Sequence, residues 1–246
     1  MKENSHIFYV PDAKDATVGQ QVYLDEDESA HCCKVLRLRP GEVISIIDGF
    51  GHMYEAELTI CDRRNCAASI TQIDTDTYIR PYRNHVAIAP TKNIDRFEWF
   101  VEKAVEFGID EITPILCDHS ERKVLKTDRL QKIIISAVKQ SGNATMPILN
   151  ELTPFADFVG KCTAPYRMIA HCEPQEKKLF HQNVSQGQSS CILIGPEGDF
   201  SNAETPSCLQ RTGQDQVQSH LWRHRSLLAR QPQGHPQTSL NFNYKQ

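Results

Sequence analysis

The sequence has no long apolar segment and no large excess of charge of either sign. Neither an apolar run of about 18 residues nor an apolar stretch near the first residue is present, so we expect neither membrane insertion nor secretion. The formal net charge is -4, so an RNA or DNA partner would have to bind a local basic patch. These absences favour a soluble cytoplasmic protein of one or two domains.

Several motifs of common enzymes are also missing. The chain contains no G-x-G-x-x-G for a dinucleotide, no G-x4-G-K-[ST] for a nucleoside triphosphate and no G-x-S-x-G of a hydrolase. Among its nine cysteines there is no C-x-x-C pair, and neither Cys32-Cys33 nor Cys61-x4-Cys66 has a common zinc spacing. We therefore predict no metal site and mostly buried, reduced thiols.

Short alternating apolar runs characterise residues 1–74. Turn formers such as Pro40-Gly41 and Asp48-Gly49 separate the runs, a pattern that predicts a small β-rich, barrel-like domain. One turn of this domain carries three cations, enough for several phosphate contacts: Lys34, Arg37 and Arg39. A solvated surface explains three such cations equally well, so both interpretations stay open.

The pattern changes after a polar segment, residues 75–84, which we interpret as a linker. Strands are predicted at residues 85–89, 112–116, 167–170 and 191–194, and amphipathic helices at 95–107 and 128–140. The apolar residues at helical spacing in the first of these helices are Phe97, Phe100, Val101, Ala104 and Phe107. Strands that alternate with helices predict an α/β domain whose mostly parallel sheet is covered on both faces.

Residues 191–204 read C-I-L-I-G-P-E-G-D-F-S-N-A-E, which predicts a strand, a glycine turn and the start of a helix. Ser201 and Glu204 have the spacing of a capping box. Ligands bind at the carboxyl end of such strands, and the missing Cβ atoms of Gly195 and Gly198 permit a close approach to the backbone. An ordinary tight connection between strand and helix has the same spacing.

The G-P-E-G loop, followed by an aromatic residue and Ser, resembles the cofactor loop of the ribosomal RNA small subunit methyltransferase E family. This family belongs to the knotted SPOUT methyltransferases. Other segments resemble it in the same order along the chain: Lys92-x3-Arg96-x-Glu98-Trp99, Ile112-Thr113-Pro114, Ser120-Glu121-Arg122 and Ala137-x-x-Gln140-Ser141-Gly142. The resemblance extends from about His6 to Glu204, and it departs from the family at Asn143 and Asp199, where Arg and Gly are usual.

The resemblance implies a PUA-like RNA-binding domain at residues 1–74 and a SPOUT domain at 85–204. It implies methylation of N3 of a specific uridine in 16S rRNA with S-adenosyl-L-methionine as cofactor, by a homodimer that acts on the small ribosomal subunit. The implied cofactor contacts are Ala170, His171, Ile194, Gly195, Pro196, Glu197 and Gly198. Lys92 and Arg96 are the catalytic candidates, and they join Lys34, Arg37 and Arg39 as RNA contacts. His171 could equally be structural, and Lys92 and Arg96 a solvated helix start.

Residues 205–246 do not resemble the family. A helix, a short strand and L-G-x-x-x-L-R-x-E-T-A are expected after Glu204, and we find none of them; Pro206 opposes a helix, and the composition predicts disorder. Either a divergent extension or a reading-frame shift in the gene explains this tail. The alternatives to an active methyltransferase are a catalytically impaired RNA-binding remnant and an α/β enzyme that acts on a small molecule.

Overall fold

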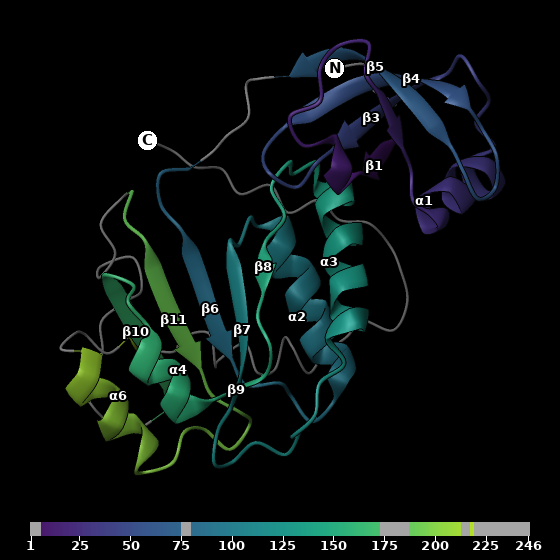
Figure 1. Ribbon diagram of the computed structural model, residues 1–246. Coiled ribbons are helices and arrows are strands. Elements are labelled where there is room, and N and C mark those ends of the chain that lie inside the picture. The colour runs from purple at the N-terminus through teal and green to yellow at the C-terminus, as the bar shows by residue number, and fades with distance from the viewer. Residues whose placement is uncertain (1–5, 75–79, 173–186, 213–216, 219–246) are drawn as a thin grey trace, which may run out of the picture.

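The computed structural model describes residues 6–74, 80–172, 187–212 and 217–218, which form two modules, each built on one sheet (Figure 1). The N-terminal sheet has the strand order β1-β3-β4-β5-β2. The second sheet has the order β12-β10-β11-β6-β7-β8, with β9 paired to β7. Within the described residues, no helix is both long enough and apolar enough to span a bilayer.

The N-terminal sheet confirms the predicted β-rich module. Its strands are β1 (Ile7–Tyr9), β2 (Gln21–Tyr23), β3 (Val43–Ile47), β4 (Met53–Ile60) and β5 (Ala67–Asp74), with a short 3-10 turn, η1 (Pro11–Ala13). Alternation along the strands buries one face, whose largest side chains are Phe8, Ile44, Ile46, Tyr54, Leu58 and Ile70. A curled sheet around this core gives the module its shape.

The segment with three cations is not the simple turn that we predicted. It contains α1 (Glu26–Ala30) and the wide π-type helix η2 (His31–Leu36). Asp25 starts α1, because its side chain accepts a hydrogen bond from the amide of Glu28 at 2.7 Å. Arg37 ends η2 in the left-handed conformation, with φ of 58°.

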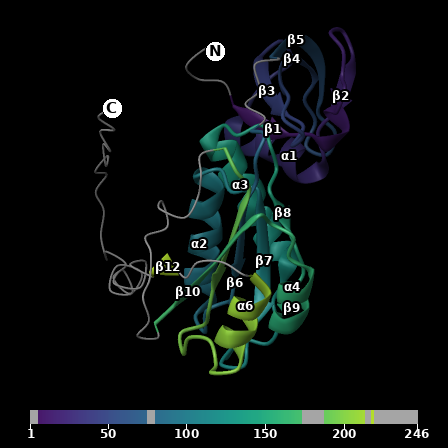
Figure 2. The ribbon, with the colours of Figure 1, turned by 90° about the vertical axis from the view of Figure 1, so that its left-hand side faces the viewer.

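The second module is a parallel sheet between two layers of helices (Figure 2). Its strands are β6 (Asn84–Ile88), β7 (Glu111–Leu116), β8 (Ile148–Leu149), β9 (Thr153–Pro154), β10 (Tyr166–His171), β11 (Ser190–Ile194) and β12 (Val217–Gln218). One face is covered by α2 (Ile94–Glu106) and α3 (Thr127–Ser141), and the other by α4 (Phe155–Lys161) and α6 (Glu204–Thr212). This arrangement confirms the predicted mostly parallel α/β sheet with helices on both faces.

Helix α2 differs from the predicted helix at its carboxyl end. The Asn93 side chain caps its start by accepting from the amide of Asp95, and the helix ends at Glu106. Phe107 therefore follows the last turn and is 89% exposed, contrary to its predicted place on the apolar face. Val105 is buried there instead.

Helix α6 also differs from the prediction that no helix follows Glu204. Pro206 lies in its first turn, where a missing amide costs no helical hydrogen bond. The backbone of β12 then pairs in parallel with β10, with Val217 opposite Ala170. The other residues of the predicted tail, 213–216 and 219–246, lie outside the described residues.

The two modules pack together at the carboxyl end of α3. Ile47 of the N-terminal sheet belongs to the apolar core that contains Val138 of α3. Lys139 at the end of α3 forms an ion pair with Glu28, with 2.7 Å between Nζ and Oε1. Since α3 runs back from the carboxyl end of β7, the N-terminal module lies beyond the amino ends of the parallel strands (Figure 1).

Candidate functional site

The glycine loop follows β11 at the carboxyl end of the strand. A Cβ atom added to Gly195 would lie 3.0 Å from the ring of Phe200. Phe200 is buried, and its ring centroid lies 5.6 Å from that of Phe155 on α4. Gly195 is therefore needed for packing of the loop on this face of the sheet, a role that the sequence alone did not indicate.

Asp199 adopts the left-handed conformation in this loop, with φ of 65°. It occupies the position where the resembling family usually has Gly, and Asp is one of the few L-residues that visit this conformation routinely. Gly198 is exposed and is not in that region, but an added Cβ would lie 3.2 Å from the Cβ of His119. The loop thus approaches the β7 loop closely at Gly198.

Asp199 also connects the ends of β10 and β11. Its Oδ2 accepts a hydrogen bond from the amide of Cys172 at 2.6 Å. His171 ends β10 and is completely buried, and Ala170 lies opposite Ile194 in the parallel register. The structure therefore brings the two predicted cofactor segments together.

The loop after β6 is held from two directions. The amide of Lys92 donates to Glu197 Oε1 at 3.0 Å, which ties this loop to the glycine loop. Arg122, from the loop after β7, donates to the carbonyl oxygens of Thr91 at 3.1 Å and Lys92 at 2.6 Å. The rigid guanidinium with its several donors fixes the backbone of Lys92 relative to the neighbouring loops.

The side chain of Lys92 lies beside Glu121, with 2.7 Å between Nζ and Oε2. The hydrogen bond that the ammonium of Lys92 donates to Glu121 raises the pKa of Lys92, so the ammonium stays charged at neutral pH. Arg96 is exposed in the first turn of α2 and places a second cation beside this loop. Both candidates can stabilise a developing anion, and neither can act as a general base in this state.

The predicted capping box is present and extends the site. The amide of Ser201 donates to Glu204 Oε2 at 2.9 Å, and the amide of Glu204 donates to Ser201 Oγ at 3.3 Å. The second oxygen of Glu204 accepts from the amide of Asp118 at 2.9 Å. The start of α6 is thereby joined to the loop after β7.

Four loops consequently meet at one edge of the sheet, after β6, β7, β10 and β11. This carboxyl edge is where ligands bind in open α/β sheets. It presents the carboxylates of Glu197 and Asp199 and the cations of Lys92 and Arg122, with a cavity of about 380 Å³ beside Lys92. Such a site can hold a ligand that carries both charges and orient it against a second molecule.

Arg122 and His119 were not among the predicted site residues. The only signal for Arg122 was the Ser120-Glu121-Arg122 triplet. His119 had no signal, because its contact with the glycine loop depends on how the two loops cross.

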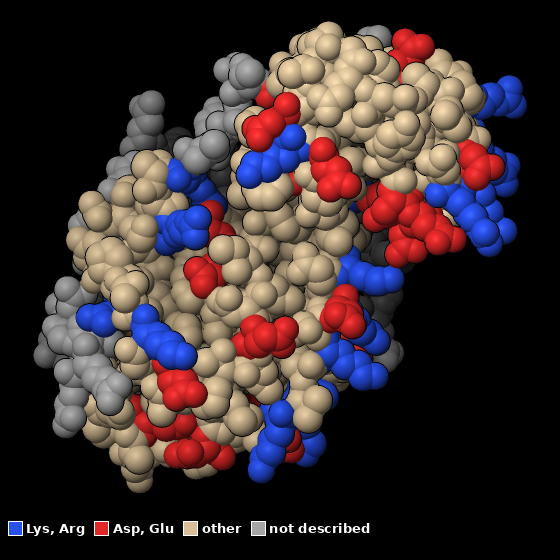
Figure 3. Space-filling view, viewed as in Figure 1, with Lys and Arg blue, Asp and Glu red and all other residues tan. Residues whose placement is uncertain are grey.

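The cations of η2 lie far from this edge. Lys34, Arg37 and Arg39 are exposed on the N-terminal module, beyond the opposite end of α3. Since α3 has 15 residues, its two ends are about 22 Å apart. In Figure 3, basic and acidic side chains are interspersed over the visible face, without a surface of one sign across it. The structure does not bring these three cations together with Lys92 and Arg96.

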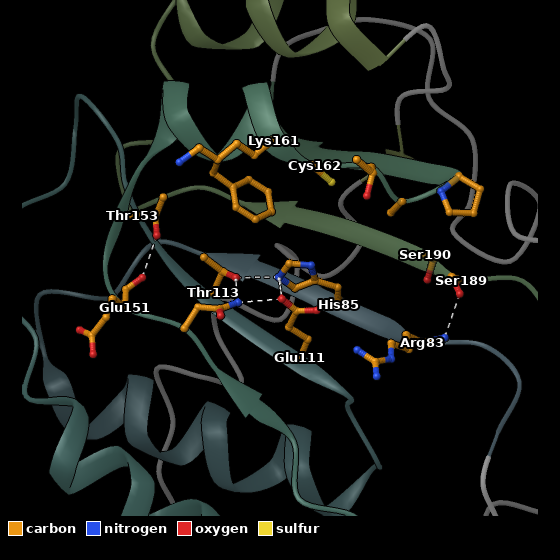
Figure 4. Close-up of a pocket in the computed structure, with 15 residues that line it drawn as sticks. Arg83, His85, Glu111, Thr113, Glu151, Thr153, Lys161, Cys162, Ser189 and Ser190 are labelled. Carbon is orange, nitrogen blue, oxygen red and sulfur yellow. Dashed lines mark hydrogen bonds and ion pairs between the residues drawn. The ribbon is translucent and has the colours of Figure 1, made fainter.

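A cavity of about 580 Å³ lies at the amino ends of the strands, between the sheet and α4 (Figure 4). His85, Glu111 and Thr113 point into it, and His85 Nε2 lies 2.7 Å from Thr113 Oγ1. The side-chain nitrogen of Asn150, Nδ2, donates to Glu111 Oε1 and to Thr113 Oγ1, each at 2.7 Å. None of the predicted site residues lines this cavity, although His85 and Glu111 are polar residues at the starts of otherwise apolar strands.

The comparison with known proteins agrees with this architecture. The RNA methyltransferase domain family matches residues 79–217, and the RNA methyltransferase PUA domain family matches residues 24–71. The ribosomal RNA small subunit methyltransferase E of Rickettsia conorii is 24% identical over 188 residues, which cover 76% of each chain. A probable rRNA-methyltransferase from Porphyromonas gingivalis is 35% identical, with a TM-score of 0.76 over 86% of this chain and 88% of that one. The chain belongs to the ribosomal RNA small subunit methyltransferase E family.

A third relative was solved with a ligand. The ribosomal RNA small subunit methyltransferase E of Neisseria gonorrhoeae, bound to S-adenosyl methionine, is 26% identical, with a TM-score of 0.76 over 87% of this chain and 89% of that one. Membership of the methyltransferase E family confirms the expected SPOUT-type domain, the PUA-like module and the class of enzyme, an RNA methyltransferase. The match reaches residue 217, beyond the limit at Glu204 that the motifs had indicated.

Proposed function

We propose that this chain transfers the methyl group of S-adenosyl-L-methionine to N3 of a specific uridine in the 16S rRNA of the small ribosomal subunit. The observation that supports this most is the meeting of four loops at the carboxyl edge, joined through Asp199, Glu197 and Arg122, in a member of the methyltransferase E family. The cofactor supplies an electrophilic methyl group, so the protein needs only to bind, orient and polarise.

The cofactor site is assigned to the ends of β10 and β11. The contacts that we propose are Ala170, His171, Ile194, Gly195, Pro196, Glu197 and Gly198. The charges at this edge fit the ligand, because the carboxylates of Glu197 and Asp199 can attract its cationic sulfonium and ammonium groups. The residues next to Ile194 are buried and provide an apolar wall. The exposed backbone at Gly198 provides polar main-chain groups beside that wall.

Lys92 and Arg96 are assigned to the acceptor base. Loss of the N3 proton leaves a negative charge on the uracil ring, and a fixed cation beside it lowers the free energy of that anion. Lys92 suits this role because Arg122 and Glu197 hold its backbone in place, while the hydrogen bond to Glu121 keeps its side chain protonated. The two cations therefore polarise the acceptor, and another group or water removes the proton.

The RNA surface is assigned to both ends of the molecule. Lys34, Arg37 and Arg39 supply phosphate contacts that position the RNA without reading its sequence. An RNA that reaches them and Lys92 must extend over about 22 Å on one chain or span two chains. We accordingly propose a homodimer, with 16S rRNA as partner and the cytoplasm as its location.

The alternative is a catalytically impaired RNA-binding remnant. It is favoured by one observation: no L-G-x-x-x-L-R-x-E-T-A motif follows Glu204 in the sequence. An α/β enzyme acting on a small molecule, without RNA, is the third possibility.

Two binding measurements on the full chain separate these functions. Calorimetry measures the affinity for S-adenosyl-L-methionine, and filter binding over a series of salt concentrations measures the affinity for 16S rRNA. The methyltransferase binds both ligands, the remnant binds RNA alone, and the small-molecule enzyme does not bind RNA. A chain that binds neither ligand would refute the proposal.

A further inference from the structure

Four cysteines that lie apart in the sequence meet inside the N-terminal module. Cys32 and Cys33 belong to η2, Cys61 follows β4, and Cys66 precedes β5. Their four Sγ atoms all lie within 4.8 Å of one another. The separations from Cys33 Sγ are 2.8 Å to Cys61 and 3.4 Å to Cys66, and Cys61 lies 4.0 Å from Cys66. We call these four residues the cysteine cluster.

The size of the cysteine cluster fits a tetrahedral metal centre. Zinc binds thiolate sulfur at about 2.3 Å, so four sulfurs at the corners of a tetrahedron are about 3.8 Å apart. The observed separations lie around this value, and all four cysteines are free. A disulfide, with about 2.05 Å between its sulfurs, would link only two of the four and leave two thiols beside it.

The chemistry of the cysteine cluster also selects the metal. Four sulfur ligands in tetrahedral geometry are typical of structural zinc sites, where no coordination position is left for a substrate. Cys32 and Cys66 are completely buried, while Cys33 and Cys61 are half-buried and leave a path for an ion to enter. We propose that Cys32, Cys33, Cys61 and Cys66 bind one structural zinc ion.

The spacing of the cysteines did not indicate this site, and the shape of η2 explains why. Zinc spacings are usually recognised as two short C-x2-4-C pairs. Cys61-x4-Cys66 has this spacing, contrary to our interpretation of the sequence, whereas Cys32 and Cys33 are adjacent. Neighbouring side chains on a regular helix point about 100° apart. The wide turn of η2, a type of distortion often found at functional sites, directs both thiols toward Cys61 and Cys66.

The proposed zinc would connect the basic segment to the sheet. Cys61 Sγ lies 3.0 Å from the carbonyl oxygen of Leu38, next to Arg37 and Arg39. A metal that joins η2 to the β4–β5 connection therefore fixes where these two cations lie. This consequence rests on the proposed RNA-binding function, whereas zinc binding itself does not.

The test is metal analysis of the full chain, purified under reducing conditions from cells supplied with zinc. Inductively coupled plasma mass spectrometry is expected to find one zinc per chain, and cobalt(II) substitution to give the visible spectrum of a tetrahedral thiolate centre. The variant with Cys33→Ser and Cys61→Ser changes the two half-buried ligands, and its zinc content is expected to fall to near zero. Cys172→Ser, at an exposed cysteine outside the cluster, is the matched control and should retain the zinc.

Folding of the variants is checked separately by circular dichroism, so that loss of zinc is not confused with loss of the whole structure. The zinc site is supported if the original chain contains one zinc ion per chain and the folded double variant contains almost none. If the double variant does not fold, the four thiols of the original chain are alkylated instead. Rapid alkylation of all four thiols before a chelator is added would overturn the proposal. Slow alkylation that becomes rapid when a chelator removes the zinc would support it. A zinc-free original chain, iron in place of zinc, or a Cys33–Cys61 disulfide found by mass spectrometry would overturn it. The RNA affinity of the double variant tests the proposed RNA-binding function and does not decide whether the cysteine cluster binds zinc.

Discussion

Replacing Asp199 with Ala tests whether the two cofactor loops act as one unit. The change removes the acceptor that ties the end of β10, through the amide of Cys172 at 2.6 Å, to the loop after β11. It also places Ala at φ of 65°, a conformation that Asp tolerates better. Two separable losses are therefore expected from one substitution.

The magnitude follows from these two effects. A hydrogen bond to a charged acceptor contributes about 1.5 to 3 kcal/mol, and the exposed position of this bond favours the lower end. The left-handed conformation costs an ordinary L-residue about 1 to 2 kcal/mol. Asp199→Ala should thus lower the free energy of unfolding by about 2 to 4 kcal/mol. Asp199→Gly, which loses the bond but not the conformation, should lower it by about half as much.

Calorimetry with S-adenosyl-L-methionine and urea unfolding distinguish the two losses. Both variants should bind the cofactor about 10-fold more weakly, since about 1.4 kcal/mol of loop ordering is lost in each. Only Asp199→Ala should show the additional loss of stability. Equal stability of the two variants would refute the conformational argument, and unchanged affinity in both would show that the tether does not shape the cofactor site.

Three other predictions follow from the charged residues. Lys92→Met should lower the rate of methyl transfer by about 100-fold with little change in cofactor affinity, while Lys126→Met, an exposed control on the same side, leaves the rate unchanged; equal rates for the two variants would contradict the role of Lys92. Changing Arg37 and Arg39 to Ala should weaken binding of any RNA sequence and lower the salt slope by about 1 to 2, and an unaltered slope would return them to a solvated surface. Burial lowers the pKa of His85, against the opposing effect of Glu111, so the unfolded chain binds more protons below about pH 6.5 and stability is lost as the pH falls. The urea unfolding free energy should therefore fall less between pH 7 and pH 5 in His85→Asn than in the original chain, and identical losses would exclude this effect.

The regular elements were predictable because their patterns are local. The apolar runs of residues 1–74, the four longer strands of the second sheet, and α2 and α3 have clear periods, whereas the two-residue strands β8, β9 and β12 have none and were not predicted. The capping box of Ser201 and Glu204 was predictable for the same reason.

The remaining features depend on contacts that spacing does not record. Helix α4 has only seven residues and includes a glycine, and it forms because Phe155 and Phe158 are buried against the sheet. Helix α6 was missed because Pro206 was treated as a breaker, although it lies in the first turn. Arg122 could not be assigned, because its partners lie about 30 residues earlier, in another loop.

The most direct test of the proposed methyl transfer is to locate the methyl group. The full chain is incubated with S-adenosyl-L-methionine and small ribosomal subunits from cells that lack the homologous enzyme, and the 16S rRNA is digested and analysed by mass spectrometry. We predict one new 3-methyluridine at a single position, absent when the cofactor is omitted. Methylation at another atom or on another RNA would contradict the proposed target, and no methylation by a folded chain that binds both ligands would favour the catalytically impaired remnant.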